Sequence, residues 1–209
     1  MSIDALVPLK RLDHAKTRLA SVLDPSTRAH VMRALLGHTL EQVKAAPSIG
    51  SVTLVSSAVE ASSIAVEHGV AHFDDRGLPW NDALSAAIAE SVTSEAVVIV
   101  SADVPLLTVE DVERFVAVLT RRGVVIARAT DAGTNAVAMD PAGAMETTFG
   151  VEGSAARHAE LAEASGLTPV IVDIPGLAHD LDTTEDLEEV LRHVMSDEVR
   201  AVLAGARAQ

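Results

Sequence analysis

The segment 96–101 limits the possible folds of this chain more than any other part of the sequence. It contains four successive aliphatic residues, Val97–Val100, and an uninterrupted apolar run of this length indicates a β-strand buried on both faces. Such strands occur mostly in parallel sheets that helices cover on both sides. The run therefore predicts a protein of the α/β class.

Short apolar runs alternate with longer segments of helical period along the rest of the chain. We expect further strands at 3–9, 52–56, 70–73, 124–127, 136–139 and 169–174, and helices at 25–46, 58–68, 81–91, 108–121, 154–165 and 183–195. This order predicts a single domain over residues 1–209, with a mostly parallel sheet between two helical layers. In open sheets of this kind, ligands bind beyond the carboxyl ends of the strands.

The composition excludes several classes of protein. The chain has 209 residues with 16 Lys and Arg against 30 Asp and Glu, a net charge of −14, which argues against nucleic acid as a partner. It has no cysteine, which excludes disulfide scaffolds, thiolate nucleophiles and Cys-ligated zinc. Neither a signal peptide nor an apolar stretch of about 20 residues is present. We expect a soluble cytoplasmic protein that does not bind membranes.

A basic loop follows the first expected strand in this otherwise acidic chain. Lys10, Arg11, Lys16 and Arg18 fall within nine positions. Such a cluster can neutralise a triphosphate and stabilise the charge on a pyrophosphate leaving group. The alternative is a solvated loop with ordinary surface charges, since the glycines of a Walker A loop are missing.

Acidic residues follow the most apolar strand and precede the last expected helix. Asp103 stands just after the 96–101 run, where a carboxylate is costly unless a cation meets it. Mg²⁺ suits that position when a nucleoside triphosphate is the substrate. Asp180 and Asp182 are two residues apart in an extended segment, so they point the same way and could share a cation. A turn before Pro105 and a helix cap at Asp182 or Thr183 are the structural alternatives.

Two glycine-containing loops and one amide complete the set of candidates. The segment 131–135 contains Thr134 and could be a simple hairpin turn. The segment 149–158 runs into a helix with Ser154 as its expected N-cap, and amides at a helix N-terminus bind phosphate or carboxylate. Asn81 offers an amide for a base or a ribose, or else caps its helix.

Taken in order, six segments resemble those of the 2-phospho-L-lactate/phosphoenolpyruvate guanylyltransferases, which serve biosynthesis of the deazaflavin coenzyme F420. They read Pro-Leu-Lys…Ala-Lys-Thr-Arg-Leu, Leu-Pro-Trp-Asn-Asp-Ala-Leu, Ala-Asp-Val-Pro-Leu-Leu, Asp-Ala-Gly-Thr-Asn, Phe-Gly…Ser-Ala-Ala-Arg-His and Asp-Leu-Asp-Thr. The resemblance spans residues 7–187. Each segment is unspecific alone, whereas six in this order are specific.

The resemblance implies a Rossmann-like, three-layer α/β/α nucleotidyltransferase fold (GT-A-like), akin to the molybdopterin guanylyltransferases. It implies roles for ten residues, of which Lys16, Arg18 and Asp103 would be catalytic. Lys10, Lys16, Arg18 and Asn81 would bind the nucleotide, Asp103, Asp180 and Asp182 would hold Mg²⁺, and Thr134, Gly150 and Ser154 would bind the acceptor. The acceptor loop departs from the family because three residues separate Gly150 from Ser154, so either Gly153 or Ser154 could make the contact.

The reaction that the resemblance implies is transfer of GMP from GTP to phosphoenolpyruvate or 2-phospho-L-lactate, with release of pyrophosphate. The composition, rich in Ala and Val, is similar to that of actinobacterial members and favours phosphoenolpyruvate. The product could be handed to the downstream transferase of the pathway. His14, His158 and His179 could assist, although a lone histidine near a helix is more often structural.

Three alternatives remain open. One is a guanylyltransferase acting on 3-phosphoglycerate, which carries the same two anionic groups. Another is a nucleotidyltransferase for a sugar phosphate or the molybdenum cofactor, although residues 9–19 lack the glycine-rich loop usual there. The third is a non-catalytic nucleotide-binding protein, against which the three acidic candidates and the basic loop argue.

Overall fold

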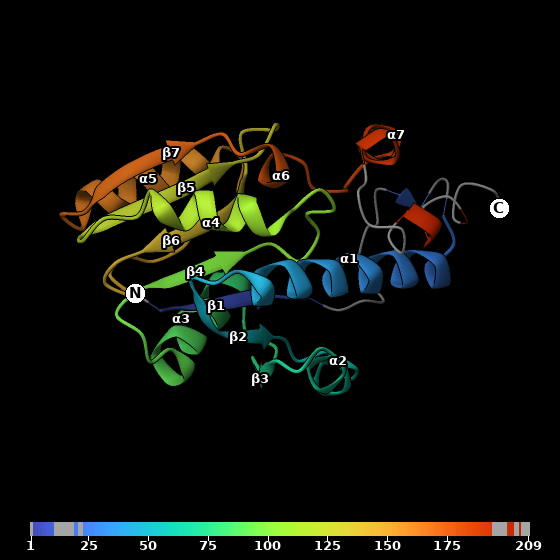
Figure 1. The fold of residues 1–209 in the computed structure, drawn as a ribbon, viewed down its shortest axis with the longest axis horizontal. Helices are drawn as coiled ribbons and strands as arrows, with labels where there is room; N and C mark the ends of the chain where they lie inside the picture. The colour runs from blue at the N-terminus through green and yellow to red at the C-terminus, as the bar shows by residue number, and fades with distance from the viewer. Residues whose placement is uncertain (1, 11–18, 21–22, 194–199, 203–204, 206–209) are drawn as a thin grey trace.

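The computed structural model describes residues 2–10, 19–20, 23–193, 200–202 and 205 (Figure 1). Lys16 and Arg18 lie outside the described residues. Within them, seven strands form one sheet in the order β3-β2-β1-β4-β6-β5-β7. The strands are β1 (Ile3–Pro8), β2 (Ile49–Val55), β3 (Ala71–Phe73), β4 (Val97–Val100), β5 (Gly123–Arg128), β6 (Thr134–Met139) and β7 (Thr168–Val172).

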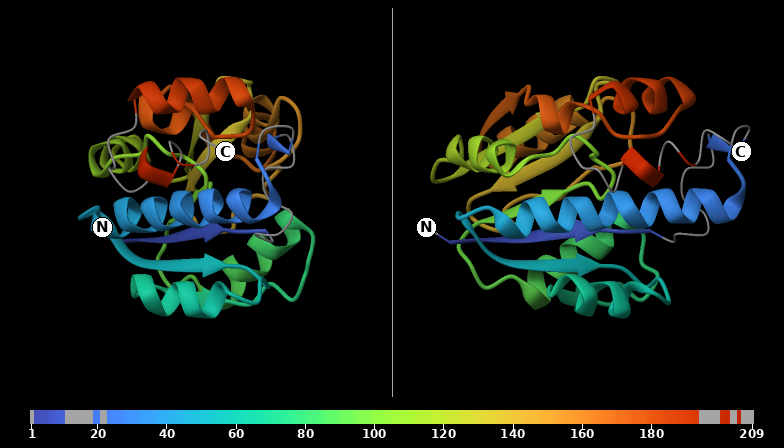
Figure 2. Two further views of the ribbon diagram at one scale, coloured as in Figure 1. Left: turned by 90° about the vertical axis from the view of Figure 1, so that its right-hand side faces the viewer. Right: turned by 45° about the vertical axis from the view of Figure 1, so that its right-hand side comes forward.

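The helices cover both faces of this sheet. They are α1 (Pro25–Ala45), α2 (Ala61–His68), α3 (Trp80–Ser91), α4 (Val109–Ala117), α5 (Ser154–Ala164), α6 (Pro175–Ala178) and α7 (Thr184–His193). One apolar cluster joins the sheet to α1, α2, α4 and α6, and a second joins its other face to α3 and α5. Figure 2 shows α2 and α5 at opposite ends of the molecule. The predicted three-layer α/β/α arrangement is confirmed.

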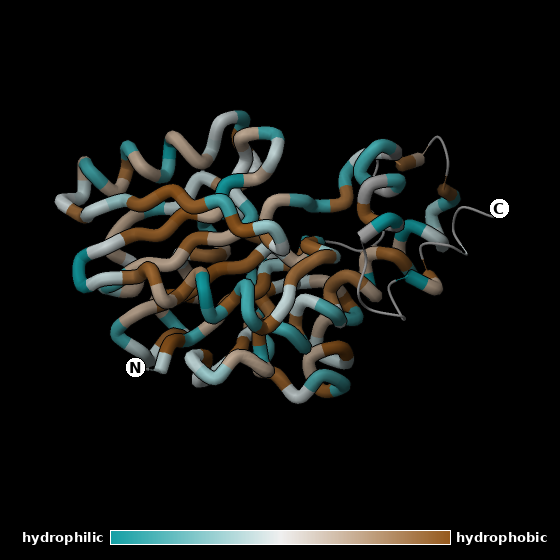
Figure 3. The backbone as a smooth tube through the Cα atoms, turned by 45° about the horizontal axis from the view of Figure 1, so that its top comes forward, coloured by the Kyte–Doolittle hydropathy of each residue, from teal (hydrophilic) through white to brown (hydrophobic). Residues whose placement is uncertain are grey.

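The strands alternate between these two clusters with the period of a pleated sheet. In β4, Val98 and Val100 pack on the side of α1, while Val97 and Ile99 pack on the side of α3. All four are at most 1% exposed, which is why the run is apolar at every position. Figure 3 shows the same pattern as hydrophobic segments through the middle of the sheet.

The sheet is mostly parallel, as the sequence predicts, and β6 breaks the rule. It pairs antiparallel with both β4 and β5, whereas every other pairing among the described strands is parallel. β6 follows β5 through a short hairpin at 129–133, which reverses the chain without a crossover helix. The start of β6 therefore lies at the edge where β4 and β5 end.

Three local expectations are wrong. Helix α4 ends at Ala117 rather than Arg121, although its predicted N-cap Thr108 does form a capping box with Asp111. The single turn α6 was not expected, because four residues are too few to show a helical period. The N-cap of α5 is Gly153, not Ser154.

A buried carboxylate in β1 also had no predicted role. Asp4 is 5% exposed and accepts hydrogen bonds from the Ser51 hydroxyl (2.7 Å) and the Thr93 and Ser94 amides (2.7 and 2.9 Å). Burial raises the pKa of the Asp4 carboxyl, but these hydrogen bonds outweigh it and lower the pKa to about 2. The ionised side chain thus ties β1 to β2 and to the segment before β4.

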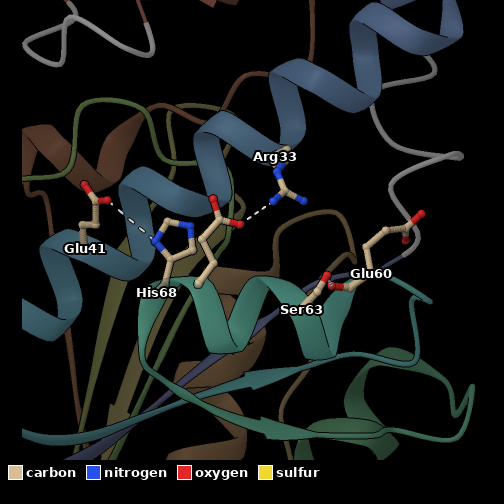
Figure 4. Close-up of polar contacts among 6 residues, drawn as sticks. Arg33, Glu41, Glu60, Ser63 and His68 are labelled. Carbon is tan, nitrogen blue, oxygen red and sulfur yellow. Dashed lines mark hydrogen bonds and ion pairs between the residues drawn. The ribbon is translucent and has the colours of Figure 1, made fainter.

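Polar contacts join α1 to α2 on the outside of the sheet (Figure 4). Arg33 of α1 forms an ion pair with Glu67 of α2, and Glu41 lies 3.7 Å from Nδ1 of His68. Arg33, Glu41 and Glu67 are largely exposed, and His68 is half-buried. Solvent screens such pairs, so each contributes little stability. None of the helices in the described ranges has both the length and the hydropathy that crossing a membrane requires.

Candidate functional site

A cleft of about 460 Å³ opens at the edge of the sheet where β4 ends and β6 begins. The reversal of β6 brings the two ends together, and the Ser101 amide donates to the Asn135 carbonyl at 2.8 Å. The lining includes Trp80, Ser101, Asp103, Asp131, Thr134, Asn135, Phe149–Ser154, Asp180 and Asp182. Six of the residues predicted to form the site, from four separate segments of the chain, therefore line one cleft.

One end of the cleft carries the acidic residues. Asp103, Asp180 and Asp182 are each partly exposed, and each offers a carboxylate oxygen within 4.8 Å of the others. Three carboxylates at this separation repel one another unless a cation lies between them. Hard oxygen ligands suit Mg²⁺ or another hard divalent ion. The geometry thus fits the predicted metal set, and we call these three residues the acidic cluster.

Leu181 explains why Asp180 and Asp182 face Asp103. Its side chain is fully buried among apolar residues that include Leu19 and Leu35, and its amide donates to the Asp103 carbonyl at 3.3 Å. In an extended segment the neighbours of an inward residue point the other way. Burial of Leu181 therefore turns both aspartates toward the cleft.

Hydrogen bonds upstream hold the same segment against the hairpin. The Asn135 amide group donates to the Leu177 carbonyl at 3.0 Å, and the Thr130 amide donates to the Ala178 carbonyl at 2.9 Å. Asn135 is 4% exposed, so this contact is shielded from water. The sequence analysis missed this role, since nothing local links residues 42 positions apart.

The structure separates the acidic cluster from the helix cap in this segment. Thr183 accepts from the Asp186 amide at 3.2 Å, and Asp186 accepts from the Thr183 amide at 2.7 Å. This reciprocal pair is a capping box for α7. The cap is therefore Thr183, and the Asp182 carboxylate is placed in the acidic cluster instead.

At the other end of the cleft, two hydroxyls are hydrogen-bonded to each other and to a histidine. The Thr134 hydroxyl lies 2.9 Å from the Ser154 hydroxyl and 3.1 Å from Nδ1 of His158. The hairpin docks on α5 through the Ala155 amide, which donates to the Ala132 carbonyl at 3.4 Å. This docking brings Thr134 and Ser154 together across 20 residues.

His158 is fully buried behind the two hydroxyls. Its Nε2 accepts a hydrogen bond from the Thr148 amide at 2.9 Å, and its ring meets the edge of Phe149 at 5.0 Å between centroids. Burial lowers the pKa of the ring to about 4, against a smaller opposing effect of the Ser154 backbone. His158 is therefore a neutral imidazole near pH 7.

The loop between Phe149 and α5 depends on two glycines with left-handed backbones. Gly150 has φ of 76° and Gly153 has φ of 67°, values that most other residues adopt only with strain. Gly153 ends the loop as the N-cap of α5, so the Ser154 hydroxyl is available to Thr134. Of Gly153 and Ser154, only Ser154 has a side chain that can bond to Thr134.

Asn81 clamps this loop. Its side-chain oxygen accepts from the Phe149 amide and the Thr147 hydroxyl, both at 2.9 Å, and its nitrogen donates to the Phe149 carbonyl at 3.2 Å. The amide thus braces the chain beside Gly150. Nucleotide binding by Asn81 stays a prediction, and the structure gives most of its hydrogen-bonding groups to the loop.

Lys10 lies against Trp80, which lines the cleft. The Lys10 ammonium lies 4.8 Å from the centroid of the Trp80 ring, a cation–π distance. The cleft also contains Asp131 and Glu152 besides the acidic cluster. A site this acidic can hold a polyphosphate only with added cations, supplied by basic side chains or a metal.

The chain is similar in sequence to known guanylyltransferases. A family profile described as "Guanylyl transferase CofC like" matches residues 3–206. The phosphoenolpyruvate guanylyltransferase of Sphaerobacter thermophilus is 37% identical over 92% of this chain and 94% of its own. The 2-phospho-L-lactate guanylyltransferase of Methanothermobacter thermautotrophicus is 31% identical over 99% of this chain and 92% of its own.

A solved structure agrees with the fold. A protein from Desulfovibrio desulfuricans G20, assigned only by class as a nucleotide-diphospho-sugar transferase, superposes with a TM-score of 0.80. The match covers 100% of this chain and 96% of the other, at 17% sequence identity. At that identity the likeness establishes the predicted nucleotidyltransferase-like fold and nothing more.

Proposed function

Because the chain belongs to the family of CofC-like guanylyl transferases, we propose that it transfers GMP from GTP to phosphoenolpyruvate and releases pyrophosphate. Relatives named for this substrate support the choice, and 2-phospho-L-lactate, the substrate of a 31% identical relative, is the alternative acceptor. The product would serve biosynthesis of the deazaflavin coenzyme.

One observation carries the proposal: a single cleft joins the acidic cluster to a neutral pair of hydroxyls. The acidic cluster suits a metal-bound triphosphate. The pair of Thr134 and Ser154 offers a hydrogen bond to a phosphate or carboxylate without adding charge. Both ends line the same cleft, so two anionic substrates would meet between them.

The proposed reaction is a direct displacement at phosphorus. A phosphate oxygen of the acceptor forms a bond to the α-phosphorus of GTP, and the bond from that phosphorus to the bridging oxygen of pyrophosphate breaks with its electron pair. A phosphate monoester is mostly ionised at neutral pH because its second pKa is about 6. No general base is therefore required, and catalysis rests on positioning and charge stabilisation.

Asp103, Asp180 and Asp182 would hold Mg²⁺ in this scheme. When bound, the cation would neutralise charge on phosphate oxygens as it builds up during transfer. The chain itself fixes the three carboxylates through the buried Leu181 and its hydrogen bond to the Asp103 carbonyl. Lys10, Lys16 and Arg18 would meet the triphosphate and the leaving pyrophosphate.

The test is to incubate the protein with Mg²⁺, one nucleoside triphosphate and one acid at a time. GTP and CTP are compared as donors, with phosphoenolpyruvate, 2-phospho-L-lactate and 3-phosphoglycerate as acceptors. Product mass and pyrophosphate release are measured together. We expect the guanylylated acid with GTP and the highest kcat/KM for phosphoenolpyruvate. Pyrophosphate release without a guanylylated acid, or a preference for CTP, would contradict the proposal.

A further inference from the structure

The proposed reaction assigns no role to His158, although both of its ring nitrogens are hydrogen-bonded. We propose that His158 is a positioning residue that makes the hydroxyl pair of Thr134 and Ser154 a hydrogen-bond donor toward the anionic acceptor. The inference rests on the proposed function, because it assumes that this pair meets the acceptor.

The first step is to place the ring proton. The Thr148 backbone N–H can only donate, so Nε2 of His158, 2.9 Å away, must accept and carries no proton. A neutral imidazole then has its proton on Nδ1. The ring is neutral near pH 7 because burial disfavours its charged form. The contact with Thr148 therefore selects the Nδ1–H tautomer.

The second step is to count hydrogens. Nδ1–H of His158 donates to the Thr134 oxygen at 3.1 Å, and the Thr134 and Ser154 oxygens share one hydrogen bond at 2.9 Å. Three hydrogens are available, one on the ring and one on each hydroxyl, and these two contacts use two of them. One hydroxyl hydrogen is left over, whichever of the two hydroxyls donates to the other.

The opposite tautomer would reverse the outcome. With Nδ1 as an acceptor, Thr134 would donate to the ring and Ser154 would donate to Thr134. No hydroxyl hydrogen would remain, and the pair would present only lone pairs to the cleft. An anion needs a donor, and lone pairs facing it are repulsive. The tautomer of His158 thus decides whether this end of the cleft attracts or repels the acceptor.

The surroundings keep this arrangement intact. His158 is fully buried, and Thr134 and Ser154 are 7% and 1% exposed, so bulk water cannot supply competing partners to the inner side of the pair. The Thr148 amide is held in place by its neighbours, since Asn81 clamps both Thr147 and Phe149. The hydrogen bond from the Thr148 amide to His158 is therefore held in place by the contacts of Asn81 with the same loop.

The first test reads the tautomer directly. The full-length chain, labelled with ¹⁵N at histidine, is examined by NMR near pH 7 without ligands. The ring signals of His158 are assigned by through-bond correlations to its own backbone in uniformly ¹³C- and ¹⁵N-labelled protein, so no variant is needed. We expect a neutral ring with its proton on Nδ1. A proton on Nε2, or a charged ring, overturns the inference independently of any kinetic result.

The second test separates the two nitrogens by substitution. His158→Gln can keep an acceptor near the position of Nε2 for the Thr148 amide, but it places no donor at the level of Nδ1. His158→Asn does the reverse. His158→Gln leaves one hydroxyl hydrogen of the pair available, but it removes the ring N–H that keeps Thr134 from turning its own hydrogen inward. Because this orientation is lost, we expect the acceptor KM to rise by about tenfold, with the KM for GTP unchanged. His158→Asn should lie closer to the wild type in acceptor KM.

The outcomes are distinguishable. If His158→Asn is the impaired variant and His158→Gln is normal, His158 only anchors the loop and the inference is wrong. If Thr134→Val and Ser154→Ala leave the acceptor KM unchanged, the acceptor site of the proposed function is wrong instead. If those two variants raise it while His158→Gln does not, the positioning role alone fails. Should neither His158 variant fold, the NMR measurement still decides.

Discussion

The two ends of the cleft are built on different principles. The acidic cluster consists of partly exposed charged groups placed by backbone contacts, such as that between Leu181 and Asp103. The hydroxyl end consists of buried neutral groups that are bonded to one another through their side chains. The first end gathers three like charges, which a cation would offset, whereas the second end is neutral and its hydroxyls are bonded to each other.

The difference follows from the cost of burial. A carboxylate without a cation loses several kcal/mol when it is taken out of water, so a cluster of three stays partly exposed. A hydroxyl can be buried at little cost once its hydrogen bonds are made. The acidic end should therefore respond strongly to metal, and the hydroxyl end should not.

The largest effect is expected at the acidic end. Asp103→Asn removes an anionic ligand and should lower kcat at least a hundredfold, about 3 kcal/mol in activation free energy. The variant should also lose most of the rise in Tm that Mg²⁺ gives to the wild type. Steady-state kinetics and thermal unfolding measure both.

A matched variant controls for loss of charge alone. Glu160→Gln removes an exposed carboxylate from α5, away from the cleft, and should leave both activity and the Mg²⁺ effect intact. Near-normal kcat in folded Asp103→Asn would exclude Asp103 from the mechanism.

The next effect concerns acid stability at the hydroxyl end. His158 has a pKa near 4 in the folded protein and an ordinary value of 6.5, so the unfolded chain binds more protons between these pH values. Above pH 6.5 the ring is neutral in both the folded and the unfolded state, so the protein keeps its full free energy of unfolding there. About 3 kcal/mol of it should be lost as the pH falls toward 4.

Urea unfolding at a series of pH values measures this loss. His158→Asn removes the titrating group, so its unfolding free energy should depend less steeply on pH between 6.5 and 4. Equal slopes for the two proteins would mean that the ring is not held neutral in the fold.

The third prediction concerns the acceptor. Thr134→Val keeps the side-chain shape and removes the hydroxyl, which should raise the acceptor KM tenfold to a hundredfold, about 1.5–3 kcal/mol. The binding of GTP alone, followed by calorimetry, should change little. Thr39→Val is the control, because Thr39 is fully buried and its hydroxyl has no partner among the described residues. A loss of GTP affinity alone would mean that the two ends are assigned in reverse.

The smallest effect is expected from the clamp. Asn81→Ala removes three hydrogen bonds to Thr147 and Phe149, and it should raise the acceptor KM severalfold, about 1 kcal/mol, by loosening the loop. The sequence-based prediction that Asn81 binds the nucleotide leads to a rise in the KM for GTP instead. Measuring both constants decides between the two roles.

The acidic end could be predicted from the sequence because its signals are local. Asp103 directly follows an apolar strand, and the spacing of Asp180 and Asp182 places them on one side of an extended segment. The parallel sheet then brings strand ends to one edge. The fold class was equally accessible, since the 96–101 run and the alternation of elements require only short windows of sequence. The family resemblance supplied Thr134 and Ser154, and both line the cleft.

The remaining features depend on long-range contacts that no local pattern encodes. The reversal of β6 brings Thr134 to His158 across 24 residues, and Asn81 meets Phe149 across 68. The choice of Ser154 as a helix cap failed for the same reason, because its hydroxyl serves the hairpin rather than its own helix. Nothing in the sequence around Asp4 indicates its role, because its partner Thr93 is 89 residues away along the chain.

Under the proposed assignment of Thr134 to the acceptor, the reversed strand β6 would also make acceptor choice separable from the rest of the molecule. Thr134 stands at the base of a hairpin rather than at the end of a crossover, and a hairpin can be lengthened, shortened or retyped without altering strand order. Changes at 129–133 would remodel one wall of the cleft while Asp103 stays at the end of β4. Under the proposed function, a change in this one turn would therefore alter the acceptor and leave the transfer chemistry unchanged.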